Sequence, residues 1–212
     1  MLVRAYEELC KIDSAVLPEI LQLFNQTAKE VCEGQQMDMD FEKMQSVDLN
    51  TYLQMITLKT SVLLAAAMKM GAIIAKASTN DADALYSFGK NIGIAFQIQD
   101  DYLDAFGDPE KFGKQPGGDI IANKKTFLTI RTLEVASKAQ REQFDELINE
   151  ADEIKIKGIL QLYRDCGADI WANELKETYF QKAMQDLATV SVSSERKEEL
   201  EKLAYYLLHR DI

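Results

Sequence analysis

Histidine and cysteine are scarce in this chain of 212 residues. The single histidine, His209, lies close to the C-terminus. With only this one histidine, near the chain end, Ser-His and Cys-His triads are excluded, and so is any metal site built from several histidines. The three cysteines, Cys10, Cys32 and Cys166, show no paired spacing. This spacing indicates reduced thiols and a cytoplasmic protein rather than a disulfide framework.

Breaks in helical structure are also few, because the chain has only 10 glycines and 3 prolines. No strand alternation, no linker rich in serine or proline, and no internal repeat can be found. No N-terminal run resembles a signal peptide, and no stretch of about 18 consecutive apolar residues suggests a membrane span. The formal net charge of −11 argues against nucleic acid and anionic membrane surfaces as partners.

Apolar periodicity predicts helices throughout, and we expect residues 1–212 to form a single all-α domain. Gly34 is expected to stop the second helix, Asp48 to cap the third, and Thr79 and Asn80 to cap the fourth. The expected helices are residues 1–12, 18–33, 49–76, 79 to about 107, 120–136, 138–151, 155–167, 168–188 and 194–208.

Three aspartates stand inside the fourth predicted helix, between residues that are otherwise apolar almost all round. Asp100 and Asp104 are one helical turn apart, and Asp101 and Asp104 are also neighbours on the helix surface. Burying like charges is costly without a counter-ion. Oxygen ligands without nearby histidine or cysteine favour Mg²⁺, which binds one or two carboxylates together with water and phosphate oxygens. The alternative is structural, with the aspartates paired to lysine or arginine from other helices.

Lys59 is the single charged residue between positions 49 and 68. It shares an apolar helix face, so a lysine that reaches outward to water is the commoner interpretation. Thr60 beside it offers a hydroxyl, and a metal-bound phosphate would give the ammonium group a partner.

Other candidate ligands lie before and after the aspartates. Gln97 is one turn before Asp100 and Asp101 and could bind a phosphate or a metal-bound water; alternatively it is a buried amide held by a neighbouring helix. Lys114, in the glycine-rich loop of residues 112–119, and Lys124 could reach an anion, although lysines in such positions are most often solvated. Asp119 fits an N-cap better than a metal ligand.

Taken together and in order, these segments resemble the trans-isoprenyl diphosphate synthases, the polyprenyl synthetase family. The matching segments are Gly34-Gln35-Gln36-Met37-Asp38 with Phe41-Glu42, Tyr52 to Thr60, Phe96-Gln97 with Asp100-Asp101 and Asp104, Gly113-Lys114, Gly118-Asp119 with Lys124, and Tyr205 to Arg210.

The resemblance implies an isoprenoid synthase-type helical bundle and Mg²⁺-assisted ionisation of an allylic diphosphate, with about three Mg²⁺ in the complete family site. The allylic cation is then attacked by isopentenyl diphosphate, and a proton is lost. The implied metal ligands are Asp100, Asp101 and Asp104. The implied diphosphate ligands are Lys59, Lys114 and Lys124, assisted by Thr60 and Gln97, and Phe96 would line the reacting centre.

The chain departs from the family pattern in one respect. The family's first aspartate-rich motif, and the Gly-Lys-Arg segment that holds isopentenyl diphosphate, are not found in this sequence. The chain therefore resembles the later, larger part of a polyprenyl synthetase domain, N-terminally incomplete. We expect weak or no activity from it alone, and a homo-oligomer, a dimer by resemblance.

Two other functions stay open. A class I terpene cyclase shares the fold, although its second metal motif typically carries asparagine and serine or threonine among the acids. A non-catalytic subunit of a heteromeric synthase is the other alternative. The sequence does not indicate product length, and farnesyl diphosphate is a guess among short-chain products.

Overall fold

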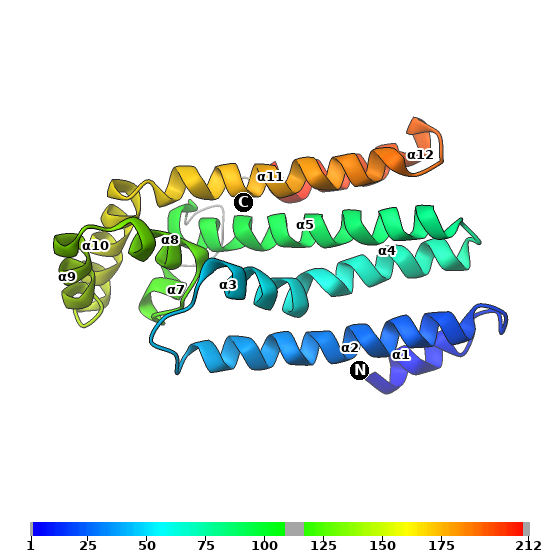
Figure 1. Ribbon diagram of the computed structural model, residues 1–212, viewed down its shortest axis with the longest axis horizontal. Coiled ribbons are helices and arrows are strands. Elements are labelled where there is room, and N and C mark those ends of the chain that lie inside the picture. Colours follow the sequence, from blue (N-terminus) through cyan, green and yellow to red (C-terminus); the bar gives the residue numbers. More distant parts are fainter. Residues whose placement is uncertain (1, 109–116, 210–212) are drawn as a thin grey trace.

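Every regular element in the part of the chain that the computed structural model describes, residues 2–108 and 117–209, is a helix (Figure 1). The prediction of an all-α fold is therefore confirmed. The elements are α1 (Leu2–Leu9), α2 (Leu17–Phe41), α3 (Leu49–Ile56), the π-helix η1 (Thr57–Ser61), α4 (Val62–Ile74), α5 (Thr79–Phe106), α7 (Gly118–Ile121), α8 (Phe127–Val135), α9 (Lys138–Leu147), α10 (Asp152–Asp165), α11 (Ala168–Thr189) and α12 (Ser194–His209).

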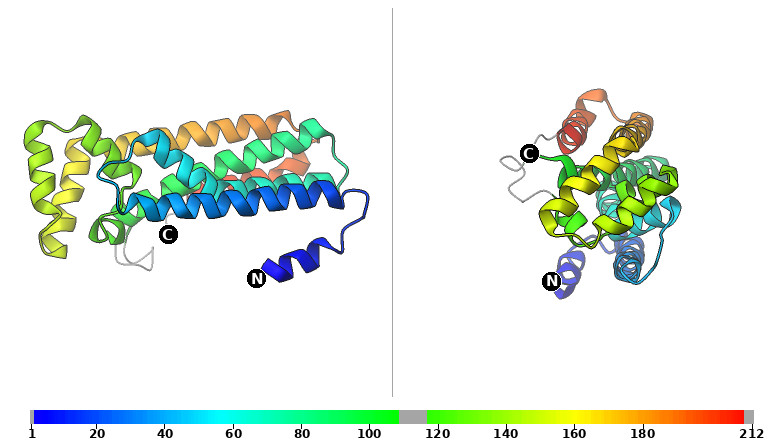
Figure 2. Two further views of the ribbon diagram at one scale, coloured as in Figure 1. Left: turned by 60° about the horizontal axis from the view of Figure 1, so that its bottom comes forward. Right: turned by 90° about the vertical axis from the view of Figure 1, so that its left-hand side faces the viewer.

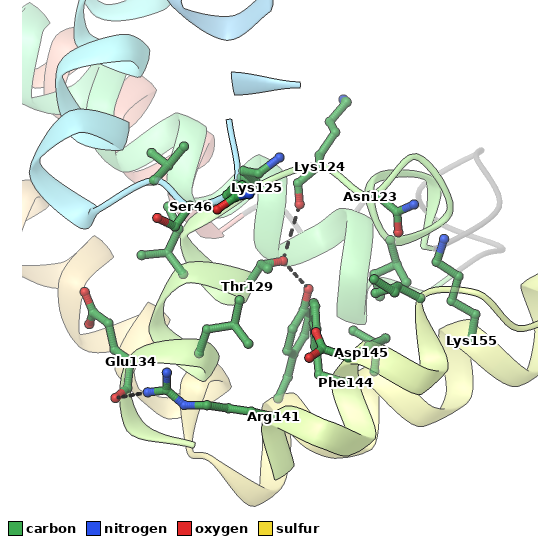
Figure 3. A pocket seen from close by; sticks show the side chains of 18 of the residues that line it. Ser46, Asn123, Lys124, Lys125, Thr129, Glu134, Arg141, Phe144, Asp145 and Lys155 are labelled. Carbon is green, nitrogen blue, oxygen red and sulfur yellow. Dashed lines mark hydrogen bonds between the residues drawn. The ribbon is translucent and has the colours of Figure 1, made fainter. Parts of the chain in front are cut away.

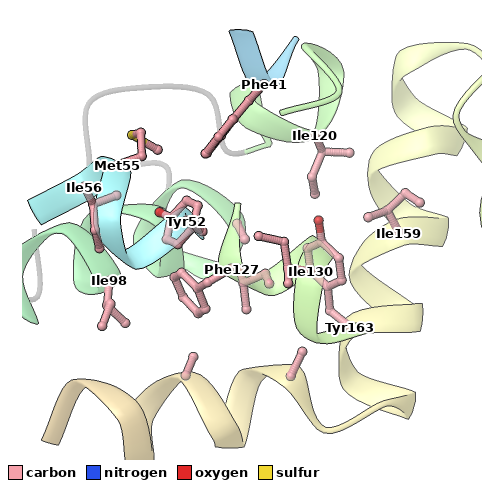
Figure 4. Close-up of a cluster of buried hydrophobic side chains, with 14 of the residues drawn as sticks. Phe41, Tyr52, Met55, Ile56, Ile98, Ile120, Phe127, Ile130, Ile159 and Tyr163 are labelled. Carbon is pink, nitrogen blue, oxygen red and sulfur yellow. The ribbon is translucent and has the colours of Figure 1, made fainter. Parts of the chain in front are cut away.

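Helix α5 is the centre of the bundle. It packs along its length against α4 on one side and α11 on the other, and α2 lies beyond α4 (Figure 1). Helices α9 and α10 lie across one end of these long helices (Figure 2). The largest apolar cluster lies at that end, where residues such as Tyr52, Ile98, Phe127 and Ile159 meet from α3, α5, α8 and α10 (Figure 4). The end of α5 that carries the three aspartates is thus fixed from several sides.

Gly34 does not stop the second helix, and that prediction is wrong. Helix α2 continues through it to Phe41. A Cβ atom at Gly34 would lie 2.3 Å from the backbone nitrogen of Lys59, which is closer than side chains ever approach. The glycine is needed because α2 and η1 touch backbone to backbone at this point.

The π-helix η1 is held on both sides by such contacts. On the α5 side, a Cβ atom at Gly93 would lie 2.7 Å from the Cα of Ser61. π-Helices are rare and occur frequently at functional sites. This one carries Lys59 and Thr60, so two glycines from separate helices determine where both candidate residues lie.

The remaining helix boundaries follow the sequence with small shifts. Asp48 caps α3 as predicted, since its Oδ1 accepts from the Thr51 N–H at 3.0 Å. Helix α5 is capped by Ser78 rather than by Thr79 or Asn80, because the Ser78 hydroxyl accepts from the Asp81 N–H at 3.1 Å. The single helix predicted for residues 120–136 is in fact α7 and α8, separated at Asn123, whose φ is +53°.

One helical segment, Leu49–Ile74, is long and apolar enough by length and composition to cross a membrane, which the sequence analysis did not predict. An 18-residue window in it has a mean hydropathy of 1.4, and 39% of that window is buried within the bundle. Its helices pack against α2 and α5. Core helices of globular proteins meet the same criterion, so this is weak evidence for a span.

Replacing Gly34 with alanine should destabilise the protein. The added methyl group would force α2 away from η1, and overpacking of this kind costs about 1–3 kcal/mol of unfolding free energy. The measurement is urea unfolding followed by circular dichroism. Gly71→Ala is the matched control, because nothing lies within 4 Å of its added Cβ. That substitution in α4 should stabilise by about 0.5–1 kcal/mol. Equal effects at both positions would contradict the close contact at Gly34.

Candidate active site

A cavity of about 550 Å³ opens beside the C-terminal part of α5. Its walls come from the end of α2, from α3 and η1, from α5, and from the segment around α7. Asp100, Asp101 and Asp104 all line it, together with Lys59 and Lys124. Two groups of residues that the sequence analysis singled out, one in residues 49–68 and one in residues 97–124, therefore meet at one cavity.

Asp101 is the most buried of the three aspartates, with 7% of its surface exposed. Its carboxylate accepts hydrogen bonds from the hydroxyl of Tyr52 and from Nε2 of Gln97, the latter at 2.9 Å. Burial raises the pKa of Asp101 to about 7, against the lowering effect of these two donors. Burial and the nearby Asp101 carboxyl also raise the pKa of Tyr52 well above its usual value. The tyrosine therefore stays protonated and acts as a donor.

Asp104 connects the cavity to the start of α7. Its Oδ2 accepts from the backbone N–H of Asp119 at 2.9 Å, and its carbonyl oxygen accepts from the N–H of Gly117. Gly117 has a φ of +89°, a conformation that favours glycine. Burial raises the pKa of Asp104. One residue thus fixes the approach of α7 to α5.

Lys59 and Lys124 each face a carboxylate across the cavity. Lys59 Nζ lies 2.6 Å from Oδ2 of Asp38 on α2, and about a third of each side chain is exposed. Lys124 Nζ lies 2.5 Å from Oδ1 of Asp119, and this hydrogen bond raises the pKa of Lys124. Asp119 is thus an ion-pair partner inside α7, and its prediction as an N-cap is wrong, because Gly117 is the N-cap. Among the described residues, Asp101 and Asp104 form no ion pair with lysine or arginine and accept from the uncharged donors described above.

Of the other predicted residues, some line the cavity and some do not. Gln97 lines it, and its Oε1 accepts from the Thr60 hydroxyl at 3.3 Å. Thr60 and Phe96 are partly buried and are not among the lining residues. The structure therefore adds nothing to the predicted role of Phe96. Lys114 lies outside the described residues.

Sequence reasoning missed Tyr52 and Lys125 as residues of the cavity wall. Tyr52 stands two helical turns before Lys59 on the same stripe, and a tyrosine facing the acidic helix could have indicated a donor. Lys125 Nζ donates to the carbonyl oxygen of Phe41 at 2.8 Å, a contact across 84 residues that no local pattern reveals.

The donor set fits a hard divalent cation such as Mg²⁺. Six carboxylates line the cavity, and no histidine or cysteine is among its lining residues. They are the five aspartates Asp38, Asp100, Asp101, Asp104 and Asp119, and Glu42. Burial disfavours the charged form of Asp101 and raises its pKa to about 7, a cost that a bound cation would offset. In the described part of the chain, no three histidine, cysteine, aspartate or glutamate side chains already lie close enough together to hold a metal ion. Mg²⁺ usually keeps several waters and binds only one or two carboxylates, so this arrangement suits it.

Comparison with known proteins gives a consistent result. The family model described as polyprenyl synthetase matches residues 1–165. The chain is 35% identical over 199 residues to the short chain isoprenyl diphosphate synthase of Methanothermobacter thermautotrophicus, covering 94% of this chain and 61% of that protein. It is 33% identical to the geranylgeranyl diphosphate synthase of Methanosarcina mazei, covering 98% and 63%.

The fold comparison agrees. A crystal structure of a geranylgeranyl pyrophosphate synthase superposes with a TM-score of 0.91 and 38% sequence identity, covering 99% of this chain and 66% of that one. The chain spans about three fifths of the length of the two curated relatives.

Asp101→Asn should flatten the dependence of stability on pH. The folded-state pKa of about 7 lies above the usual aspartate pKa of 3.8, so the folded protein binds this proton more tightly than the unfolded chain. The resulting stabilisation is complete below about pH 4 and is lost as the pH rises through 7. Above pH 7 the variant should therefore melt at a higher temperature than the unchanged protein. Thermal unfolding between pH 4 and 8 measures this.

The matched control for this experiment is Asp83→Asn, an exposed aspartate on the same helix. It should leave the pH profile unchanged. A profile for Asp101→Asn that runs parallel to that of the unchanged protein would contradict the raised pKa.

Proposed function

The chain belongs to the polyprenyl synthetase family, and from this membership and the cavity geometry we propose that it binds an allylic diphosphate with Mg²⁺ for prenyl transfer to isopentenyl diphosphate. In this reaction the allylic C–O bond breaks and the diphosphate leaves with the electron pair. The double bond of isopentenyl diphosphate forms the new C–C bond, and a proton is lost. The observation that carries the proposal is the meeting of three aspartates of one helix with Lys59 and Lys124 around one cavity.

Asp100, Asp101 and Asp104 would hold the metal. Bound Mg²⁺ neutralises the charge that develops on the leaving diphosphate. Asp101 would act as a ligand in its ionised form, which its pKa near 7 makes accessible at neutral pH. Tyr52 and Gln97 would continue to orient that carboxylate through their hydrogen bonds.

The lysines would bind the diphosphate by exchanging partners. Lys59 and Lys124 each hold a carboxylate in the structure, at 2.6 and 2.5 Å, and both ammonium groups face the cavity. A diphosphate carries more charge than one carboxylate, so it would compete for both groups. Lys114 is proposed as a third such ligand from the sequence alone.

Gln97, which lines the cavity, would assist directly, and Thr60 would assist through its hydrogen bond to Gln97. The hydrogen bond between them joins η1 to α5 at 3.3 Å. The Thr60 hydroxyl and the Gln97 amide group can both donate, so a substrate oxygen could accept from either of them.

The product is proposed to be a short-chain prenyl diphosphate. Curated relatives are named geranylgeranyl, geranylfarnesyl and farnesyl diphosphate synthases, so farnesyl diphosphate stays a prediction within this range. A dimer in the cytoplasm likewise stays a prediction, which light scattering of the purified protein would check for the oligomeric state.

Mg²⁺ and geranyl thiolodiphosphate, a non-hydrolysable allylic diphosphate, should together raise the melting temperature. A ligand that binds only the folded state stabilises by about 2.7 kcal/mol at 100 times its Kd, which corresponds to roughly 5–10 °C for a chain of this size. Asp104→Ala should abolish the shift, and Asp83→Ala on the same helix should retain it. Stabilisation without metal, or an unchanged shift in Asp104→Ala, would contradict the proposed site.

Prenyl transfer by the 212-residue chain alone should be weak or undetectable. The sequence holds one aspartate-rich motif where the resemblance implies two, so half of the expected metal ligands are missing from it. The measurement is incorporation of labelled isopentenyl diphosphate into longer diphosphates, which also gives the product length. Rapid transfer would overturn this expectation, and a cyclised hydrocarbon product would favour the cyclase alternative.

A further inference from the structure

A second cavity, of about 590 Å³, lies behind the segment that joins α7 and α8 (Figure 3). Its walls come from residues 45–48, α7, α8, α9 and α10. Asn123, Lys124 and Lys125 line both cavities, so this segment forms a wall between them. None of the three aspartates of α5 lines the second cavity.

Helix α10 presents a regular stripe to this cavity. Lys155, Ile159 and Tyr163 follow one another at intervals of one turn and all line it. Ile159 belongs to the main apolar cluster, and the Tyr163 hydroxyl shares a 2.7 Å hydrogen bond with Thr129. Ile130 and Phe144 extend the apolar surface. The cavity therefore offers a cation at one end of an apolar wall.

Lys155 is a buried cation with unused donors. Only 4% of its surface is exposed, and its Nζ donates to the carbonyl oxygen of Ile121 at 3.0 Å. An ammonium group has three N–H donors, so one backbone carbonyl leaves two of them available. No carboxylate of the described residues lies within 4.0 Å of Nζ. This is unusual for a chain whose net charge is −11.

Two further cations of the wall are held in the same way. Lys125 donates to the carbonyl oxygen of Phe41, and Arg141 donates to the carbonyl oxygens of Glu134 and Ala136. Figure 3 shows Lys125, Arg141 and Lys155 on different sides of the cavity. For the described residues, neither Lys125 nor Arg141 has a carboxylate within 4.0 Å.

Two of the carboxylates that line the cavity already have partners. Asp48 accepts from the backbone and the hydroxyl of Thr51. Glu134 forms an ion pair with Arg131 at 3.5 Å. Asp145 is the third lining carboxylate. The four lining cations, Lys124, Lys125, Arg141 and Lys155, therefore outnumber the three lining carboxylates.

We propose that the second cavity binds a small amphipathic anion, a phosphate or carboxylate with an apolar chain, without a metal ion. The anionic group lies at Lys155, and the chain lies along Ile159, Ile130 and Phe144. This site is separate from the prenyl transfer proposed above and does not depend on it. The competing explanation for the buried Lys155 is structural: its hydrogen bond to the carbonyl oxygen of Ile121 only holds α10 against the end of α7.

The experiment is isothermal titration of the protein with n-decyl phosphate in the presence of EDTA. We expect one molecule to bind per chain. Inorganic phosphate and n-decanol, each carrying half of the ligand, should bind at least about tenfold more weakly. n-Decanoate separates the two sources of the anion: binding as tight as that of decyl phosphate indicates a carboxylate ligand, and weaker binding indicates a phosphate.

Variants at α10 test the role of Lys155. Lys155→Met keeps the length of the side chain and removes the charge, so it should weaken decyl phosphate binding at least about tenfold. Lys155→Arg should restore most of the affinity. Lys157→Met is the matched control, since Lys157 is exposed on the same helix and does not line the cavity. It should bind like the unchanged protein.

A second pair keeps the proposal testable if Lys155→Met does not fold. Leu133 is half-buried in the cavity wall. Leu133→Glu and Leu133→Gln add similar polar side chains, but only the glutamate repels an anion, so it should bind decyl phosphate more weakly.

Several results would overturn the proposal. One is the absence of decyl phosphate binding to the unchanged protein. Another is unchanged affinity for decyl phosphate in Lys155→Met, which would leave Lys155 only its structural role of holding α10 against α7. A third is loss of binding in Lys59→Met, which would place the ligand in the first cavity, since Lys59 lines only that one.

Discussion

The constraint on which the site depends is the approach of three helices at η1. Gly34 of α2 and Gly93 of α5 bring two backbones within contact of the π-helix from different helices. No larger residue fits at either point without moving a helix. The candidate ligands Lys59 and Thr60 stand on the segment held between these glycines, and Gln97, the partner of Thr60, is one turn after Gly93 on α5. Packing and chemistry are therefore fixed by the same contacts.

The second constraint is electrostatic. The end of α5 buries Asp101 in the cavity wall, and this burial, with smaller contributions from Asp119 and Asp100, raises its pKa to about 7. The protein tolerates this because Tyr52 and Gln97 hold the buried carboxylate from both sides. A site that is costly in isolation becomes favourable when a cation binds, as expected for groups kept for binding rather than for stability.

Much of the fold and the acidic half of the site could be predicted from the sequence. Aspartates at one-turn spacing in an apolar helix leave few explanations, and the capping signal at Asp48 is local, so both predictions followed from short-range rules. Gly34 was misassigned because a glycine at a close helix contact looks the same in sequence as a glycine that ends a helix; only the position of Lys59, 25 residues later, distinguishes them. The break at Asn123 was missed because the apolar pattern continues across it. The second cavity has no motif, since its walls come from well-separated segments.

The carboxylate of Asp104 can bind more than one partner at a time. A carboxylate has about four lone-pair positions, and the N–H of Asp119 uses one of them. The others remain for a ligand, so the same side chain can anchor the start of α7 and coordinate a cation at once. An amide at this position has one oxygen with two lone pairs, so after accepting from the Asp119 N–H it would keep a single, uncharged position for a cation. The acidity of Asp104 thus lets loop geometry and ligand binding coexist on one residue.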